Sequence, residues 1–225
     1  MAGIELDLIK SEIYKYLGIP YWSNKLKDGV IIEEGILGGK GTCEQIAQAT
    51  IDIAKTQKID LLKLDSIEIH NFQKKNHIGI DCSGLVYHLV DKLYFYKTGS
   101  SVFDHLVGTD NQHGPRRVSS NLFTDKINAR KIDDYNDIKT GDLIRINQGR
   151  HVIFIINKEK NQINYVHSSD KTKISGVHLG QVTIVDPQKP LNFQLWSDQI
   201  KDGKNYVELI HPKKGDGIYR LLLLD

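Results

Sequence analysis

A cysteine with chemically suggestive neighbours lies in the stretch GIDCSG at residues 79–84. The apolar run LVYHLVDKLYFY follows it, which predicts a buried helix that begins at Cys82 and ends before Gly99. The first turn of a helix offers unpaired N–H groups and the positive end of the macrodipole, and both stabilise a thiolate. The Cys82 N–H would then donate to an oxyanion, and Gly84 would leave room for a substrate backbone. The competing interpretation is a small buried hydrophobe, the commoner fate of a lone cysteine.

A nucleophilic thiol needs a base, and the base needs an orienting partner. His151 opens the apparent strand HVIFIIN, and His167 lies near the end of the apparent strand INYVHSS. With KEKN as the hairpin turn, the start of the first strand lies beside the end of the second. Both imidazoles are therefore expected at the same end of the sheet. Taken singly, each is more often a surface or hydrogen-bonded residue, so the pairing across one hairpin is what favours catalysis.

The remaining titratable residues add no second cluster. His88 follows Cys82 in the same predicted helix but points to a different face. Cys43 and Cys82 match no metal-ligand spacing and are too few for a disulfide framework. We therefore expect no metal and no organic cofactor. No arrangement comparable to the His151–His167 pair is found for the other histidines: His70, His77, His88, His105, His113, His178 and His211.

Helical patterns dominate the first part of the chain. Apolar residues recur at helical spacing over residues 4–17. A second helix is predicted over Thr42–Thr56, with Thr42 as N-cap and Gln45 in the capping-box position. Residues 24–41 are rich in glycine and charge, which predicts a loop, and their GGKG stretch lacks the ending of a phosphate loop. Residues 58–78 fit either a strand or a short helix.

Short strands dominate the second part. Residues 99–137 are predicted to be connecting loop with short helical pieces, because Gly, Asp, Asn and Pro interrupt every apolar cluster. Helices first and strands last predict an α+β fold with an antiparallel meander, forming one domain over residues 1–225. The predicted strands are DLIRIN (142–147), HVIFIIN (151–157), INYVHSS (163–169), GQVTIVD (180–186) and GIYRLLLLD (217–225).

Charge and hydropathy exclude several classes of protein. The formal charge is +2 and the basic residues are dispersed, so a nucleic-acid binder is not expected. No stretch approaches the roughly 20 apolar residues that span a bilayer. The N-terminus alternates charged and apolar residues and lacks the apolar core of a secretory signal. By default this predicts a cytoplasmic protein, or a secreted one if the chain has been trimmed.

Six stretches carry a resemblance to a known family. The sequence resembles the NlpC/P60 family of papain-like cysteine peptidases, and the matching pieces occur in the family's order. The resemblance covers most of the chain except residues 23–77 and the C-terminal segment. The combination of DCSGLV with GDL and then HV is specific. The six stretches are GIPYW (18–22), DCSGLV (81–86), RVSSN (117–121), IKTGDLIRI (138–146), HVIFI (151–155) and YVHSS (165–169).

The resemblance implies a papain-like fold, with an antiparallel sheet packed against the helix that carries the nucleophile. It implies Cys82 as nucleophile, His151 as general base and acid, and His167 as the residue that orients the imidazole. It also implies roles outside this triad. Tyr21 would assist the oxyanion or position substrate, whereas the nucleophile turn and neighbouring subsites would be shaped by Asp81 and Ser83.

The resemblance further implies hydrolysis of peptide or amide bonds in bacterial cell-wall stem peptides, so a peptide or muropeptide is the expected partner. Residues 23–77 form an insertion that would roof or narrow the cleft. The missing signal motivates an alternative: an intracellular amidase, acyltransferase or toxin that uses the same thiol chemistry on peptides or lipids. A non-catalytic binding module is the alternative from another class, and the presence of Cys82, His151 and His167 argues against it. The oligomeric state is left open.

Overall fold

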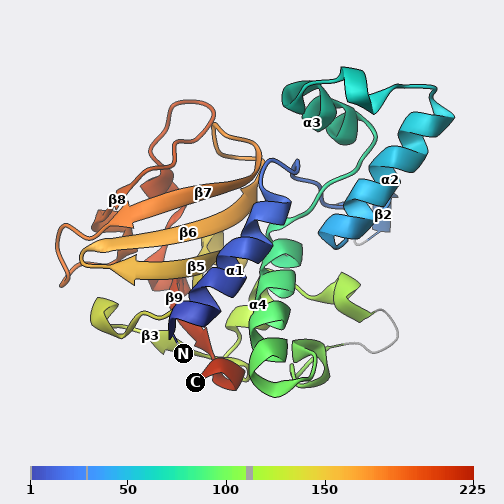
Figure 1. Cartoon of the computed structure of the whole chain (residues 1–225). Coiled ribbons are helices and arrows are strands. Elements are labelled where there is room, and N and C mark those ends of the chain that lie inside the picture. The colour runs from blue at the N-terminus through green and yellow to red at the C-terminus, as the bar shows by residue number, and fades with distance from the viewer. Residues whose placement is uncertain (1, 29, 110–113) are drawn as a thin grey trace.

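A seven-stranded antiparallel sheet forms the centre of the structure, a computed structural model that describes residues 2–28, 30–109 and 114–225. Its strand order is β3-β9-β4-β5-β6-β7-β8 (Figure 1). The predicted α+β class with an antiparallel sheet is therefore confirmed. The strands are β3 (Ala129–Ile132), β4 (Leu143–Ile146), β5 (His151–Glu159), β6 (Gln162–Ser169), β7 (Gly176–Thr183), β8 (Leu195–Trp196) and β9 (Gly217–Leu221).

The strands β4 to β8 follow one another in space as in sequence, which confirms the predicted meander. β7 begins four positions before the predicted strand, at Gly176, and this extension pairs His178 with His167. β3 lies within the segment predicted to be loop, so that prediction is wrong there. Only the first and last residues of β3 are buried, and its centre is Arg130 and Lys131. A four-residue edge strand with polar central residues gives almost no period-two signal.

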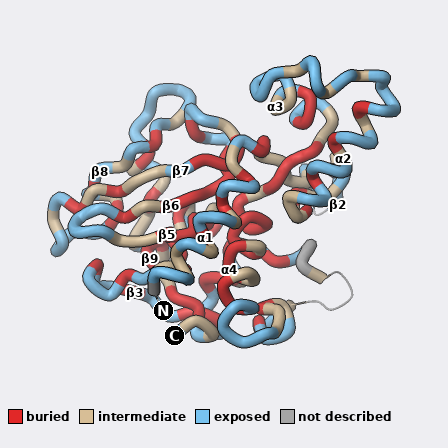
Figure 2. Tube along the Cα trace, in the orientation of Figure 1, coloured by how far each residue is buried: buried red, intermediate tan, exposed pale blue. Residues whose placement is uncertain are grey.

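Helices α1 (Ala2–Tyr16) and α4 (Cys82–Thr98) lie side by side on one face of the sheet (Figure 1). α4 is the most buried helix, and it ends at Gly99, which adopts a left-handed conformation with φ 77°. Burial is concentrated along α4 and the central strands (Figure 2). The short helix α5 (Ser120–Thr124) precedes β3. No helix in the described part of the chain is long and apolar enough to cross a membrane.

The predicted insertion forms a lobe beside the start of α4, away from the sheet (Figure 1). The predicted helix at 42–56 is confirmed as α2 (Cys43–Thr56), including the Thr42 capping box. The loop prediction for 24–41 is wrong where β1 (Lys25–Lys27) pairs with β2 (Val30–Glu33). The ambiguous segment contains α3 (Ser66–Lys75), which Asp65 and Glu68 cap reciprocally. That capping box favours the helix over a strand.

Candidate active site

The turn that leads into Cys82 is fixed by several elements. Asp81 is the N-cap of α4, and its Oδ1 accepts the Gly84 N–H at 2.6 Å, so Cys82 is the first residue of the helix as predicted. Ile80 forms bridges with Tyr21 on one side and Lys40 on the other. The Ile80 carbonyl also accepts the Ser168 hydroxyl at 2.6 Å, which ties the turn to β6. The turn is therefore held by segments that are distant in sequence.

The Cys82 thiol is buried, with 6% of the residue exposed. Its Sγ lies 3.5 Å from Ser120 Oγ on α5, and the backbone N–H of Val152 on β5 lies close enough to lower the pKa of the thiol. Burial, and then the charge of Asp81, raise the pKa of Cys82, while Ser120 and the Val152 N–H act in the opposite direction. The net shift is upward. The helix start therefore does not produce a thiolate by itself, contrary to the sequence-based expectation, because desolvation outweighs it.

The histidine pair lies where the hairpin predicted it. His151 Nε2 is 2.8 Å from His167 Nδ1. The β5–β6 ladder runs from Phe154–Val166 to Glu159–Gln162, so it stops short of this end of the two strands. The thiol meets β5 at Val152, the residue after His151. Among the described residues, no hydrogen bond joins the thiol directly to the His151 ring.

Two further residues extend the pair into the interior, and the expectation that His178 has no comparable arrangement is wrong. His167 Nε2 lies 2.9 Å from His178 Nε2 and 3.0 Å from Asp198 Oδ2. The Asp198 carboxylate also accepts the Tyr165 hydroxyl at 2.6 Å. Burial acts to raise the pKa of Asp198, but its contacts with His167, His178 and Tyr165 outweigh burial and hold that pKa below its usual value. The carboxylate is therefore an anion behind His167.

The partners of the rings assign the proton positions. The Gly176 carbonyl can only accept, so His178 carries a proton on Nδ1, 2.9 Å away. His167 Nε2 then carries the proton toward Asp198 and His178, and its Nδ1 accepts the His151 Nε2–H. The neutral His151 ring is left with a lone pair on Nδ1, the form that a general base requires.

The protonation state of His151 fits this assignment. Burial, and then the charge that His167 would carry, hold the pKa of His151 well below 6.5. Burial also lowers the pKa of His167, although the hydrogen bond to Asp198 opposes that shift. At neutral pH Cys82 is therefore a thiol and the His151 and His167 rings are neutral, instead of forming a thiolate–imidazolium pair.

The same interior residues form a group that could hold a metal ion, which the sequence analysis did not anticipate. Donor atoms of His167, His178 and Asp198 lie within 4.8 Å of one another. His178 is 11 residues from His167 and 20 residues from Asp198, so no ligand-spacing motif marks them. The three residues come together because β7 starts at Gly176 and because the chain after β8 returns Asp198 to the two rings. A metal ion would have to bind the lone pair of His167 Nε2. In the assignment above that nitrogen carries a proton, which it donates to Asp198, so it has no lone pair to offer.

A cleft of about 340 Å³ opens over this end of the sheet. It is lined by Tyr21, His151 and Tyr206, with Arg150 and Lys171 among the other lining residues. The Tyr21 hydroxyl donates to Ser23 Oγ at 3.3 Å. Burial, and then proximity to Cys82, raise the pKa of Tyr21, so it is a neutral hydroxyl donor. Tyr21 and His151 therefore line one cleft, whereas Cys82 is not part of the lining but interacts with Tyr21 and Tyr206, which are.

Two expectations about the nucleophile turn change. A Cβ on Gly84 would lie 2.3 Å from the Gly39 carbonyl oxygen, so Gly84 makes room for the insertion and not for a substrate. The Ser83 hydroxyl donates to Asp81 Oδ1 at 3.1 Å and contacts the Lys40 ammonium. Asp81 and Ser83 are thus both engaged within the turn, and neither lines the cleft described above.

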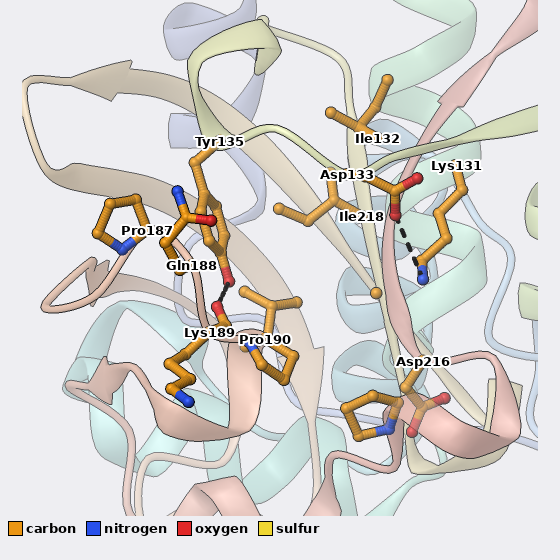
Figure 3. A pocket seen from close by; sticks show the side chains of 13 residues that line it. Lys131, Ile132, Asp133, Tyr135, Pro187, Gln188, Lys189, Pro190, Asp216 and Ile218 are labelled. Atoms are coloured by element: carbon orange, nitrogen blue, oxygen red, sulfur yellow. Dashed lines mark hydrogen bonds and ion pairs between the residues drawn. The ribbon is translucent and has the colours of Figure 1, made fainter.

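Another cleft, of about 230 Å³, lies beside β3 and β9 (Figure 3). The Tyr135 hydroxyl donates to the Lys189 carbonyl at 2.9 Å across its wall, and Lys131 pairs with Asp133 at 3.4 Å. Its lining includes Asp216 and three prolines but neither a cysteine nor a histidine. This cleft therefore offers neither thiol nor imidazole chemistry.

No family model, curated protein or solved structure matches this chain. The chemistry assigned to the site follows from its geometry. The family resemblance of the sequence motifs stays a prediction.

Proposed function

We propose that this protein is a cysteine hydrolase of peptide or amide bonds with the papain-like fold of the NlpC/P60 family. The observation that supports this most strongly is the 2.8 Å contact between His151 Nε2 and His167 Nδ1, with the thiol at the start of α4 interacting with the backbone of Val152, the residue after His151. In this proposal Cys82 is the nucleophile, His151 the base and His167 its orienting partner. Asp198 holds His167 in the required tautomer.

Acylation begins when His151 Nδ1 accepts the Cys82 proton and the sulfur attacks the amide carbonyl. The Cys82 N–H, which has no partner within its own helix, and the Tyr21 hydroxyl stabilise the oxyanion. His151 then gives its proton to the departing amine as the C–N bond breaks. His167 keeps accepting from His151 Nε2 throughout, so the ring does not have to reorient between steps.

Deacylation uses the same imidazole. His151 takes a proton from water, the hydroxide attacks the thioester, and the proton returns to sulfur as the C–S bond breaks. The products are a carboxylic acid and the free thiol. A water molecule must reach the thioester carbonyl, and in this proposal it would enter by the cleft that His151 and Tyr21 line.

The proposed substrate is the stem peptide of bacterial cell wall, which is what the resemblance implies. The cleft suits an extended peptide because Arg150 and Lys171 supply cations and Asp170 an anion along its lining. A peptide with free carboxylates and an amino group would find partners for both.

Metal-assisted hydrolysis is the competing chemistry, since His167, His178 and Asp198 could serve as ligands. All three are buried and none of them lines the cleft, but the same is true of Cys82. What favours thiol chemistry is His151, a neutral imidazole that lines the cleft and hydrogen-bonds His167.

The test is digestion of purified muropeptides, with mass spectrometry to identify the new amine and the cleaved bond. We expect cleavage by the wild-type chain, no cleavage by Cys82→Ala, and undiminished cleavage after treatment with a chelator. Inertness toward every stem peptide would refute the substrate, and acyl transfer to an added amine instead of water would indicate an acyltransferase. Loss of activity with the chelator, restored by added zinc, would move the chemistry to the metal group.

A further inference from the structure

The insertion places a buried cation on the nucleophile turn. The Lys40 side chain is only 8% exposed, and its Nζ lies 2.7 Å from Asp81 Oδ1. The same ammonium contacts Ser83 Oγ. Lys40 therefore binds the residues immediately before and after Cys82. These contacts span 41 and 43 positions of sequence.

The position of Lys40 is set by its backbone. The Asp81 N–H donates to the Gly39 carbonyl at 2.9 Å, and Lys40 pairs with Ile80. The Lys40 carbonyl accepts the His88 Nε2–H at 3.0 Å, from the next turns of α4. Because Gly84 has no Cβ, the Gly39 carbonyl can lie against the first turn of α4. The insertion is thus built into the turn and does not merely cover it.

The turn has an electrostatic conflict that Lys40 resolves. Asp81 caps α4 through Oδ1, which places an anion next to the residue that must become a thiolate. Like charges at this separation oppose each other. In Cys82 itself, the charge of Asp81 raises the pKa and that of Lys40 lowers it. The other titratable groups that interact with the thiol are Tyr21 and Tyr206.

We propose that Lys40 is a positioning residue of the active site, which neutralises the capping carboxylate of Asp81 so that the helix cap does not oppose the developing thiolate. This inference rests on the proposed function only in taking Cys82 as the nucleophile. It gives the insertion a direct role in the reactivity of the thiol.

The test is a double-mutant cycle between Lys40→Met and Asp81→Asn, read as the alkylation rate of Cys82 by iodoacetamide at pH 8. Asn keeps the capping oxygen but removes the charge. We expect Lys40→Met to slow alkylation about tenfold in the wild-type background, and Asp81→Asn to speed it. In the Asp81→Asn background, Lys40→Met should change the rate about threefold or less. Peptide mass spectrometry separates Cys82 from Cys43.

Three further variants complete the test. Lys97→Met is the matched control, because Lys97 pairs with Glu5 at 3.6 Å near the other end of α4, and it should leave the rate unchanged. Lys40→Arg should retain the wild-type rate, since it keeps the charge. Lys40→Gln removes the charge but keeps a donor for Asp81 and Ser83, and is measured if Lys40→Met unfolds.

If Lys40→Met slowed alkylation equally in the wild-type and Asp81→Asn backgrounds, the inference would be overturned. That result would mean that the substitution changes the access of iodoacetamide to Cys82 and not the charge of the turn. An unchanged rate in Lys40→Met would overturn it too. Alkylation reports the thiol whether or not peptides are cleaved, so a failed hydrolysis assay would refute the proposed function and leave this result standing.

Discussion

The two cysteines of this protein occupy the same local position in different surroundings. Cys43 is the first residue of α2 and Cys82 is the first residue of α4. Thr42 caps one helix and Asp81 the other. Burial raises the pKa of both thiols, to about 11 for Cys43, where the Glu44 carboxylate adds to the effect. A helix start is therefore not enough to activate a thiol in this protein.

The difference lies in what surrounds each thiol. Near Cys43, the Tyr16 hydroxyl accepts the Cys43 N–H at 3.2 Å, so the donor that an oxyanion would need is already used. Near Cys82, the Val152 N–H and Ser120 contact the sulfur, and His151 directly precedes Val152. The comparison teaches that the base and the free N–H, more than the macrodipole, would distinguish a catalytic cysteine here.

Removal of each sulfur gives the largest expected contrast. Cys82→Ala should lower kcat/KM for muropeptide hydrolysis by at least about 10⁴-fold, because no other group can form the thioester. Cys43→Ala should keep kcat/KM within about twofold of wild type, because it removes no interaction with the transition state. Circular dichroism spectra serve as the folding control. Comparable losses in the two variants would remove the distinction between the sites.

Two histidines in different surroundings provide the next contrast. His151→Gln should lower kcat/KM by about 10³-fold, since the general base is lost while binding remains. His105 is the control: it is exposed near the other end of α4, where it contacts Ser100 and Tyr94. His105→Gln should leave kcat/KM unchanged after correction for the folded fraction. A comparable loss from His105→Gln would show that the effect is not specific to His151.

The interior residues should matter less than His151. His167→Ala is expected to lower kcat by about 10²-fold and Asp198→Asn by about tenfold, because each only orients the proton acceptor. Steady-state kinetics with an unchanged KM would identify a role in the chemical step. If His167→Ala cost as much as His151→Ala or more, the roles of the two rings would have to be exchanged.

The features that could be predicted from the sequence are those whose residues lie close together along the chain. The helix from Cys82 to Gly99 and the Thr42 capping box were predictable because their signals are local. The His151–His167 contact was predictable because one hairpin joins the two strands. The same helix-start argument, however, applies equally to Cys43 and Cys82.

The missed contacts come from long-range packing. Asp198 contacts His167 from a loop whose sequence has no periodicity. Lys40 contacts Asp81 although the sequence of α2 and α3 lies between them. His178 was missed because the first residues of β7, GVHL, were not assigned to the strand. If the predicted strand is extended back to Gly176, His178 falls opposite His167. The pairing of these two histidines could therefore have been predicted from the sequence.

The pH dependence is the smallest expected effect, and it separates a neutral pair from a thiolate–imidazolium pair. Only neutral His151 can accept the proton, and its pKa lies well below 6.5 because of burial. Activity should therefore fall only as the pH drops through a value below 6.5, and should hold constant from there to about pH 8. Measurement of kcat/KM in a constant-ionic-strength buffer series checks this. An acid limb centred above 6.5 would show that His151 is not the base.

Acid-quenched reactions test the central claim most directly, because the account requires a thioester at Cys82. The wild-type chain is mixed with substrate, quenched within one turnover and digested, and the adduct is located by peptide mass spectrometry. We predict an acyl group on the peptide that contains Cys82 and none on the peptide that contains Cys43. Hydrolysis that proceeds without any adduct on Cys82, or with an adduct on Cys43 instead, would contradict the account.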